Sequence, residues 1–410
     1  LSALTPKGLL PLATPFFIPW SNEKKKLILW KMSLLLLSVW TSSYCRTVVF
    51  SSGDSAHPDT PCFRIPSAIA IPGTNVVVAF AECRSWTGDG CMIKGRNASS
   101  GAQYFNRTIC GRRSVDGGAS WSPTTKVLPP GTYAANPSAA WHPAQRTVML
   151  IFDGTRDGLI YTSMSSDLGR TFSAPAPAVF ANRTAIVAFA GPGNSLVVHP
   201  SGWMAFAAYA HWRNYTTLAP TFWSNVYLSL DGGRTWAQDG PTFWHLGEPS
   251  LALLADGALV LDARCADGRS PYGGPPAPCD CNCRGIAVRS TVGAWSATTY
   301  DPELPDPDVE GAILGLSDGR VAFANPSSAV HRANMTLRVG RRSDGGGASI
   351  AWEHVISVGS GGPAVPAGYS SVFESDDGRV GVLWETQADG PPLTNCTGGY
   401  CQIVLTMMTL

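Results

Sequence analysis

The fold is decided by a short stretch that the chain repeats, first met as Ser114-Val115-Asp116-Gly117-Gly118-Ala119-Ser120-Trp121. Further copies occupy residues 165–172 and 229–236, and a looser copy begins at Arg342 and ends at Trp352. The aspartates at positions 116, 167, 231 and 344 are separated by 51, 64 and 113 residues, and the last interval is close to two of the others. The chain therefore contains an internal repeat with a period of about 60 residues.

Each copy is predicted to form a hairpin turn. The aspartate can cap amides of the turn, the glycines accept a positive φ, and the closing aromatic side chain packs into a sheet. Apolar runs typical of strands flank the copies, as in residues 148–152 and 226–228. Residues 46–410 hold about six periods, which predicts an all-β fold, a six-bladed β-propeller with four strands in each blade. The turns themselves are expected to be structural.

The composition agrees with a turn-rich β fold. Lys and Arg number 30 against 29 Asp and Glu, so the net charge of +1 gives no indication of nucleic acid or an anionic membrane as a partner. The 43 Gly and 32 Pro residues interrupt helices too often for a helical bundle. A hydrophobic content of 44% with 14 Trp residues supplies a core and excludes general disorder.

Residues 1–45 are predicted to be a leader outside the fold, and residues 46–410 the propeller domain. Three lysines at positions 24–26 precede Met32, an apolar run at 34–40 and small polar residues at 41–43, an order typical of a secretory signal. The apolar run is shorter than the roughly 20 residues of a membrane-spanning helix, so no transmembrane anchor is expected. Six N-glycosylation sequons also favour the secretory pathway, at Asn97, Asn106, Asn182, Asn214, Asn334 and Asn395.

The chain has 11 cysteines, and if Cys45 leaves with the leader the remaining ten can pair completely. The local candidates for pairing are Cys396 with Cys401 and Cys91 with Cys110. The run Cys279-Asp280-Cys281-Asn282-Cys283 could also indicate zinc. Zinc sites usually need a second Cys pair or a His cluster, and the sequence offers neither, so disulfides are favoured and no metal is predicted.

The repeats resemble the Asp boxes of the sialidase (neuraminidase) superfamily. Upstream of the first box, Phe63-Arg64-Ile65-Pro66 resembles the Phe/Tyr-Arg-Ile-Pro motif of that family. The resemblance covers roughly residues 60–410 and is nearest to the lysosomal sialidase branch of animals. It implies an exo-α-sialidase, a retaining hydrolase that releases terminal sialic acids from glycoproteins, glycolipids or oligosaccharides and needs no cofactor.

A sialoside carries a carboxylate on its anomeric carbon, and planar guanidinium groups match a carboxylate better than lysine does. The resemblance implies that three arginines hold this group, namely Arg64, Arg264 and Arg332, with Arg338 as the alternative to the third. It also implies that Arg84 lines the pocket near the N-acyl and C4 side of the sugar, and that Glu385 buttresses Arg64. Taken singly, each arginine would be interpreted as a solvated surface charge.

The catalytic residues implied by the resemblance are Tyr369, Glu248 and Asp89. A substrate carboxylate would repel an anionic nucleophile, and sialidases use a tyrosine instead. Tyr369 in Gly368-Tyr369-Ser370-Ser371 matches that nucleophile, and Glu248 matches the base that its high pKa requires. Asp89, five residues after Arg84, matches the general acid. On residue type alone, Tyr369 would be a core tyrosine and Asp89 a turn residue.

Two departures from the family pattern leave the substrate and the location open. Family members near this branch carry a Glu shortly before a Gly-Pro-Gly segment, whereas residues 185–190 before Gly191-Pro192-Gly193 hold no carboxylate. A deaminated or otherwise modified nonulosonic acid is therefore an alternative substrate. The C-terminus lacks a Tyr-based sorting tail, so lysosomal and secreted locations both remain open. The sequence is also compatible with a catalytically silent sialic-acid-binding propeller, with a trans-sialidase, and with a need for a partner glycoprotein.

Overall fold

The repeated turns close in the same way at each described copy. In the first copy the Ser120 amide donates to Asp116 Oδ1 at 2.9 Å, and the Gly118 amide donates to Ser114 Oγ at 2.8 Å. Asp167 and Asp231 accept the amides four residues on, both at 2.9 Å. These bonds fix the turn that joins the third and fourth strands of a blade. In the fourth copy, residues 344–348 lie outside the described residues.

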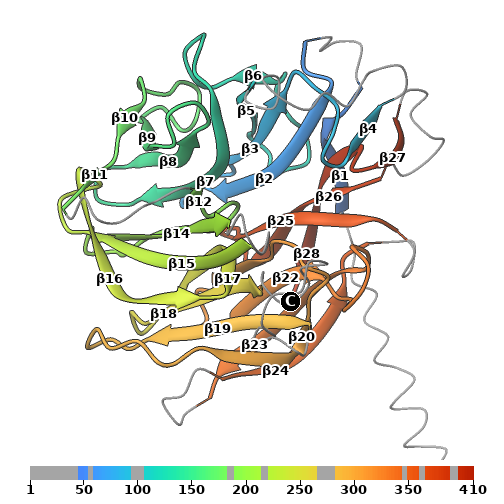
Figure 1. Cartoon of the computed structure of the whole chain (residues 1–410). Coiled ribbons are helices and arrows are strands. Elements are labelled where there is room, and N and C mark those ends of the chain that lie inside the picture. Colours follow the sequence, from blue (N-terminus) through green and yellow to red (C-terminus); the bar gives the residue numbers. More distant parts are fainter. Residues whose placement is uncertain are drawn as a thin grey trace, which may run out of the picture. The chain divides into compact units, whose positions relative to one another are not determined.

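The computed structural model describes residues 45–53, 59–93, 106–181, 189–213, 220–265, 282–343, 349–359, 365–387 and 396–410. Contacts divide the chain into Leu1–Ser43 and Tyr44–Leu410, and all described residues belong to the second part. That part consists of six sheets set as blades around a common centre, antiparallel except for one short edge strand that pairs in parallel (Figure 1). The predicted all-β, six-bladed β-propeller is confirmed. The described residues form no helix, and so they include no helix that could cross a membrane.

The blades follow one another in chain order, and each runs outward from its innermost strand, while blades 3 and 6 also take an outer strand from an earlier part of the chain. Blade 1 contains β2 (Cys62–Ala70), β3 (Val77–Arg84), β5 (Arg107–Ser114) and β6 (Thr125–Lys126). Blade 2 contains β7 (Ala134–His142), β8 (Thr147–Gly154), β9 (Ile160–Ser165) and β10 (Ala176–Pro177). In blade 3, β12 (Phe189–Ala190) and β13 (Leu196–Val198) both pair with β14 (Met204–Arg213), followed by β15 (Pro220–Ser229), β16 (Thr235–Trp244) and the edge strand β11 (Val179–Phe180).

The second half of the ring repeats the pattern. Blade 4 contains β17 (Leu246–Leu253), β18 (Leu259–Cys265), β19 (Cys283–Arg289) and β20 (Thr299–Pro305). Blade 5 contains β21 (Ala312–Gly315), β22 (Val321–Pro326), β23 (Met335–Arg342) and β24 (Ile350–Ser357). Blade 6 contains β25 (Ala367–Glu374), β26 (Arg379–Thr386), β28 (Gln402–Thr409) and, as its outer strand, β1 (Cys45–Ser51). Two short strands, β4 (Cys91–Ile93) and β27 (Cys396–Gly399), pair with each other.

The hydrophobic core is divided among the interfaces between blades. One buried cluster lies between each pair of neighbouring blades, including blades 6 and 1, where Val49, Phe63 and Leu383 meet. A blade in this ring is buried on both faces, which explains why its middle strands are runs of apolar residues such as 148–152. The antiparallel pairing of β1 with β28 closes the ring between the two ends of the propeller.

Serine hydroxyls link the innermost strands at the centre. Ser67 Oγ of blade 1 accepts the amide of Ala139 in blade 2 at 3.1 Å, and Ser371 Oγ of blade 6 accepts the amide of Ala68 in blade 1 at 3.0 Å. Ser138 and Ser250 make the same contact with the next blade at 3.0 Å. These bonds satisfy buried amides that a curved ring of short strands would otherwise leave without partners.

The innermost strands share a second device, a bulge before the serine. The pairing of β2 with β3, of β7 with β8 and of β17 with β18 shifts at Ile65, Asn136 and Glu248, and all three residues have positive φ values of 58°, 51° and 42°. The pairing of β25 with β26 shifts in the same way between Ala367 and Ser370. A bulge changes the direction in which the neighbouring side chains point. The innermost strands are therefore irregular at one end, before their serines.

Candidate active site

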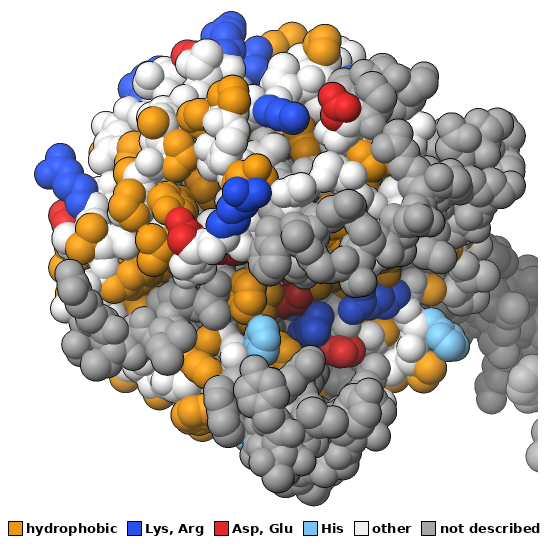
Figure 2. Space-filling model, turned by 45° about the horizontal axis from the view of Figure 1, so that its top comes forward, with side chains coloured by type: hydrophobic (Ala, Val, Ile, Leu, Met, Phe, Trp, Pro, Cys, Tyr) orange, Lys and Arg blue, Asp and Glu red, His pale blue; other side chains and the backbone are white. Residues whose placement is uncertain are grey.

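A hollow lies in the face of the propeller where the bulges occur, and charged side chains and a histidine surround a depression in this view (Figure 2). Five of its residues are predicted site residues, and most of the others come from blades 1 to 3. The lining residues are Ile65, Arg84, Asp89, Arg107, Asn136, Phe189, Tyr209, His211, Phe222, Gly247, Glu248, Arg264 and Tyr369. The sequence separates Asp89 from Tyr369 by 280 positions, and the propeller brings both to one pocket.

Tyr369, Glu248 and Arg264 form a hydrogen-bonded chain on one side of the pocket. The Tyr369 hydroxyl donates to Glu248 Oε1, and Arg264 Nη1 donates to Glu248 Oε2 at 2.6 Å. Burial and the adjacent Glu248 carboxylate raise the pKa of the Tyr369 hydroxyl well above its ordinary value, against the opposing effect of the nearby arginines. The phenol therefore holds its proton, with a carboxylate in place to accept it.

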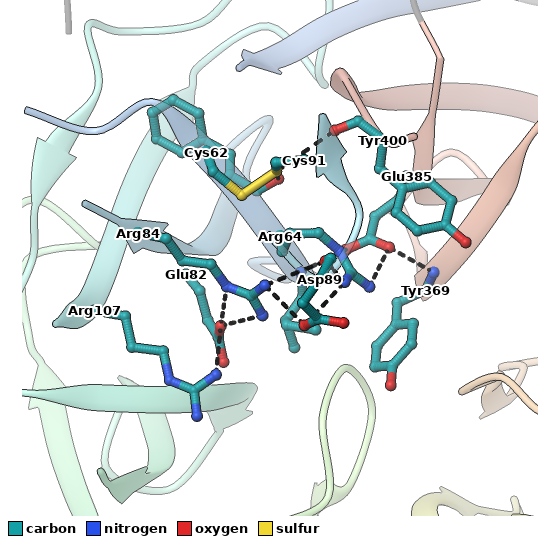
Figure 3. Close-up of polar contacts among 12 residues, drawn as sticks. Cys62, Arg64, Glu82, Arg84, Asp89, Cys91, Arg107, Tyr369, Glu385 and Tyr400 are labelled. Carbon is teal, nitrogen blue, oxygen red and sulfur yellow. Dashed lines mark hydrogen bonds and ion pairs between the residues drawn. A yellow bond between two sulfur atoms is a disulfide. The ribbon is translucent and has the colours of Figure 1, made fainter. Parts of the chain in front are cut away.

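Asp89 lies in the loop after β3, with its carboxylate beside the guanidinium groups of Arg64 and Arg84 (Figure 3). Its Oδ2 lies 2.9 Å from Arg84 Nη1 and 3.3 Å from Arg64 Nη1, and its side chain is 52% exposed. Burial alone would raise the pKa of this carboxyl, but the charges of Arg64 and Arg84 outweigh it and lower the pKa below its ordinary value. Asp89 is thus a half-exposed, ionised carboxylate held on two cations.

The three predicted carboxylate-binding arginines converge beside Tyr369. The guanidinium carbons of Arg64 and Arg332 lie 5.1 Å and 5.9 Å from the centre of the Tyr369 ring. Arg264 and Arg332 are joined through Asp308, whose carboxylate lies 2.9 Å from Arg264 Nε and whose carbonyl accepts a bond from Arg332 Nη2 at 2.6 Å. Arg338, the alternative to Arg332, instead donates to Ser327 Oγ at 2.7 Å.

Glu385 organises the buried base of the site. It accepts two bonds from Arg64, with Nε to Oε1 at 2.8 Å and Nη2 to Oε2 at 2.9 Å. It also accepts the amides of Ile65 at 2.7 Å and Tyr369 at 3.0 Å. Burial alone would lower the pKa of Arg64, but the Glu385 and Asp89 carboxylates raise it well above its ordinary value. One carboxylate therefore fixes both the first arginine and the backbone of the tyrosine.

A second polar cluster supports the pocket from blades 1 and 2. Glu82 Oε2 lies 2.7 Å from Arg84 and 3.2 Å from Arg107, and Glu82 Oε1 accepts the amide of Asn136 at 3.0 Å. The Asn136 amide group donates to Asp153 at 3.0 Å, and burial raises the pKa of Asp153 to about 7. This cluster holds Arg84 in place and keeps its guanidinium directed at Asp89.

Aromatic side chains form the wall of the pocket on blade 3. The Phe189 ring stacks on Tyr209 at 5.1 Å and on His211 at 5.5 Å between centroids, and His211 contacts Phe222 at 5.3 Å. The predicted carboxylate-binding arginines come from other blades, Arg64 from blade 1, Arg264 from blade 4 and Arg332 from blade 5. A ligand whose carboxylate reaches those arginines would place its far end against aromatic rings.

The predicted pairing of Cys91 with Cys110 is wrong. Cys91 is joined to Cys62, and Cys110 is joined to Cys83 (Figure 3 shows the first bond). The loop after β3 returns over the start of β2, which brings Cys91 to Cys62, while the pairing of β3 with β5 brings Cys110 beside Cys83. Cys45 is free and exposed, and the pairing of Cys396 with Cys401 remains a prediction because the Cys396 side chain lies outside the described part of the chain.

The described residues contain no group of three or more His, Cys, Asp or Glu side chains arranged to hold a metal ion. Cys279 and Cys281 of the cysteine-rich run lie outside the described ranges, and Cys283 is disulfide-bonded.

Several residues that shape the site were not predicted from the sequence. Asp308 joins two arginines, Glu82 pairs with Arg84, and the Tyr400 ring lies 4.8 Å from the Arg64 guanidinium carbon. Glu82 lies two residues before Arg84 on one strand, and this spacing, which puts both side chains on the same face, was the available signal. Asp308 and Tyr400 contact residues far away in the sequence, so no local pattern indicates them.

Comparison with known proteins gives a family and a fold. A family model described as a BNR repeat-like domain matches residues 108–382. Among solved structures, the NanB sialidase of Streptococcus pneumoniae is 14% identical with a TM-score of 0.65, and the match covers 89% of this chain and 70% of that one. The Ruminococcus gnavus intramolecular trans-sialidase is 15% identical with a TM-score of 0.63, covering 88% and 97%. The Hadza microbial sialidase Hz136 is 18% identical with a TM-score of 0.63, covering 86% and 66%.

Proposed function

The chain belongs to the BNR repeat-like domain family, and on that premise we propose that it is an exo-α-sialidase that hydrolyses terminal sialosides with retention of configuration. The observation that carries the proposal is the chain from Tyr369 through Glu248 to Arg264, which faces Asp89 across a pocket with Arg64 and Arg332 beside it. A neutral nucleophile with its own base, surrounded by cations, suits a sugar whose reacting carbon bears a carboxylate.

Substrate recognition rests on the arginines. Arg64, Arg264 and Arg332 would bind the substrate carboxylate, because several guanidinium groups from different blades reach one point beside Tyr369. A buried charge-assisted bond to Glu385 holds Arg64, and an ion pair with Asp308 holds Arg264, before substrate arrives, so little ordering is needed on binding. The far end of the sugar would then lie toward Arg84, Arg107 and the aromatic wall of blade 3.

The reaction has two steps. In the first, Tyr369 Oη bonds to the anomeric carbon and passes its proton to Glu248, while Asp89 gives a proton to the leaving oxygen as the glycosidic bond breaks. In the second, Asp89 takes a proton from water, the water oxygen bonds to the anomeric carbon, and Tyr369 Oη leaves and regains the proton from Glu248. Two displacements at one carbon retain its configuration.

The charge on Asp89 has to change during the cycle. Arg64 holds Asp89 ionised in the structure, and a substrate carboxylate bound to Arg64 would neutralise part of that effect. The pKa of Asp89 would rise on binding, which lets the residue take up the proton that the first step consumes. Substrate binding would thereby favour the protonated form of Asp89, which the first step needs.

The proposal is tested by hydrolysis of a fluorogenic α-sialoside by the full chain and by Tyr369→Phe. The variant is expected to lose roughly a hundredfold or more in kcat, the contribution of a positioned catalytic group. Tyr161→Phe is a matched control, because the Tyr161 hydroxyl also donates to a carboxylate, Asp157 Oδ2 at 2.6 Å, outside the pocket. Equal activity of Tyr369→Phe and Tyr161→Phe would contradict the proposed role.

The same assay separates the competing functions. A silent protein that still binds sialic acid would support the binding propeller, and transfer to an acceptor in place of free sugar would support a trans-sialidase. Faster turnover of a deaminated substrate would identify that sugar as the preferred one.

We also propose that the protein acts in the secretory pathway, in lysosomes or after secretion. The bonds Cys62–Cys91 and Cys83–Cys110 support this, since disulfides persist in oxidising compartments. A mobility shift after enzymatic removal of N-glycans from the expressed protein would support it, and an unglycosylated, cytosolic protein would contradict it.

A further inference from the structure

Glu310 is a buried carboxyl group that the proposed mechanism does not use. It lies just before β21 in blade 5 and has no solvent exposure. Its Oε2 accepts the amide of Ser370 in blade 6 at 2.8 Å. Glu310 therefore contacts the residue that directly follows the candidate nucleophile, across the boundary between two blades.

The Ser370 amide is one of two successive amides that are held by carboxyl groups. The Tyr369 amide donates to Glu385 Oε2 at 3.0 Å, and the next amide donates to Glu310. The strand pairing of β25 with β26 shifts between Ala367 and Ser370, so this part of β25 is a bulge. Two buried acceptors from different blades define the path of the backbone through the bulge, and that path decides where the Tyr369 ring points.

We propose that Glu310 is a positioning residue for Tyr369, which holds the bulge of β25 from blade 5 so that the tyrosine hydroxyl meets Glu248. The inference rests on the proposed function, because it assigns Glu310 a part in placing the nucleophile of that reaction. Glu310 itself contacts backbone and not substrate, so its effect passes through the position of Tyr369.

The surroundings of Glu310 favour the neutral acid. Burial, together with the charges of Glu248 and Glu385, raises the pKa of Glu310 well above its ordinary value, against the lowering effects of the Ser370 amide and Arg284. Among the described residues its Oε1 has no hydrogen-bond partner, and an unpaired anionic oxygen would be costly there. A neutral acceptor of the same shape, the glutamine amide, should therefore replace it.

The site around Glu310 is too close-packed to let the bulge relax freely. A Cβ at Gly193 would lie 2.8 Å from Glu310 Oε1 and 2.7 Å from the Ser370 carbonyl oxygen. Gly193 also accepts bonds from Ser67 and Ser138 at 3.0 Å, which fixes it at the centre of the propeller. The Glu310 side chain therefore lies between Gly193, at the centre of the propeller, and the Ser370 amide that follows Tyr369. The length of this side chain sets the distance between blade 5 and the bulge of β25.

The experiment compares Glu310→Gln, Glu310→Ala and Glu310→Asp in the full chain, with kcat and KM measured per folded protein on a fluorogenic sialoside. Gln keeps an acceptor for the Ser370 amide and is expected to stay within about threefold of the wild-type kcat. The Ala variant has no acceptor for the Ser370 amide, and the Asp side chain is one methylene group too short to reach that amide. Both are expected to lower kcat by tenfold to a hundredfold, the order of effect of a misplaced reacting group, with KM nearly unchanged.

Glu374→Ala is the matched control. Glu374 also links blade 6 to blade 5, by accepting the Ser317 amide at 2.8 Å, but from the other end of β25. This variant should lose stability and keep kcat. If Glu310→Ala does not fold, the kcat of Glu310→Asp tests the inference in its place. Wild-type kcat in the Asp variant, or a Gln variant as poor as Ala, would overturn the inference.

Hydrogen exchange of the peptide containing Ser370 gives a second readout that does not depend on activity. The Ala and Asp variants should exchange the Ser370 amide faster than wild type, and the Gln variant should not. If wild type hydrolyses no sialoside, the proposed function fails, whereas unchanged exchange in all three variants would overturn the role of Glu310 itself.

Discussion

The Arg64 guanidinium lies 3.3 Å from Asp89 Oδ2, so the candidate acid and the first candidate carboxylate-binding arginine are ion-paired with each other. Arg84 contacts the same oxygen at 2.9 Å. A substrate carboxylate would compete with Asp89 for Arg64. The pairing therefore couples substrate binding to the protonation of the acid.

This coupling predicts a pH effect of Arg84→Gln. Removal of a neighbouring positive charge raises the pKa of Asp89, which the arginines hold low, so the acid stays protonated to higher pH. In a plot of kcat/KM against pH, the descending limb should therefore move to higher pH. Arg84→Lys keeps the charge and should move the limb less. Identical limbs in wild type and Arg84→Gln would show that Asp89 is not the group that titrates.

Glu248→Gln should lower kcat by about 10²- to 10⁴-fold, the usual contribution of a general base. The glutamine keeps the volume of the side chain but cannot take the proton of Tyr369. Asp157→Asn removes the carboxylate from the corresponding pair with Tyr161 at the surface and should leave kcat unchanged. Steady-state kinetics at the optimum pH distinguish the two, and a fully active Glu248→Gln would exclude it as the base.

Replacing both cysteines of the Cys62–Cys91 bond by serine should impair protonation of the leaving group by Asp89 more than attack by Tyr369. The bond ties the loop that carries Asp89 to the strand that carries Arg64, and it spans 29 residues. Its loss should cost about 3 kcal/mol of stability and should slow substrates with poor leaving groups, which need protonation, more than activated aryl sialosides.

The Cys83–Cys110 bond is the matched control, with a span of 27 residues. Its double serine variant should lose similar stability without changing the ratio of rates on the two classes of substrate. The same ratio in both double variants would contradict a special role for the Cys62–Cys91 bond.

Asp153→Asn should alter the pH dependence of stability. In the folded protein burial raises the pKa of Asp153 to about 7, whereas an unfolded aspartate titrates near 3.9. Between about pH 4 and pH 7 the folded state binds more protons than the unfolded state, so the free energy of unfolding falls as the pH rises, and above this window the effect is complete. Urea unfolding across this range should give a flatter profile for the variant than for wild type. Parallel profiles would contradict a raised pKa.

The fold could be predicted because its signal is local. The repeat around Asp116, Asp167 and Asp231 is complete within eight residues at each copy, and each turn closes with bonds inside that stretch. The period of the repeat then gave the number of blades. The bulges at Ile65 and Glu248 were not predicted, since a positive φ in a non-glycine residue has no simple sequence pattern.

The site could be predicted only where a motif accompanied the residue. Arg64, Glu248 and Tyr369 lie in short stretches that resemble a known family, and the structure places Arg64 beside the Tyr369 ring and Glu248 at its hydroxyl. Asp308 and Glu310 act through contacts with Arg264 and Ser370, which are 44 and 60 positions away, and only the folded arrangement of strands and blades creates those contacts. The Cys91 pairing was wrong for the same reason, because spacing along the chain does not show which strand a loop crosses.

The central claim is that Tyr369 forms a covalent bond to the sugar, and trapping that intermediate tests it most directly. A sialosyl donor with fluorine beside the anomeric carbon and a good leaving group should form the intermediate and hydrolyse slowly, because fluorine destabilises the positively charged transition state. Mass spectrometry of the digested protein is expected to find the added sugar on the peptide containing Tyr369, and none in Tyr369→Phe. A sugar found on Glu248 or Asp89, or an active wild-type protein that is never labelled, would contradict the account.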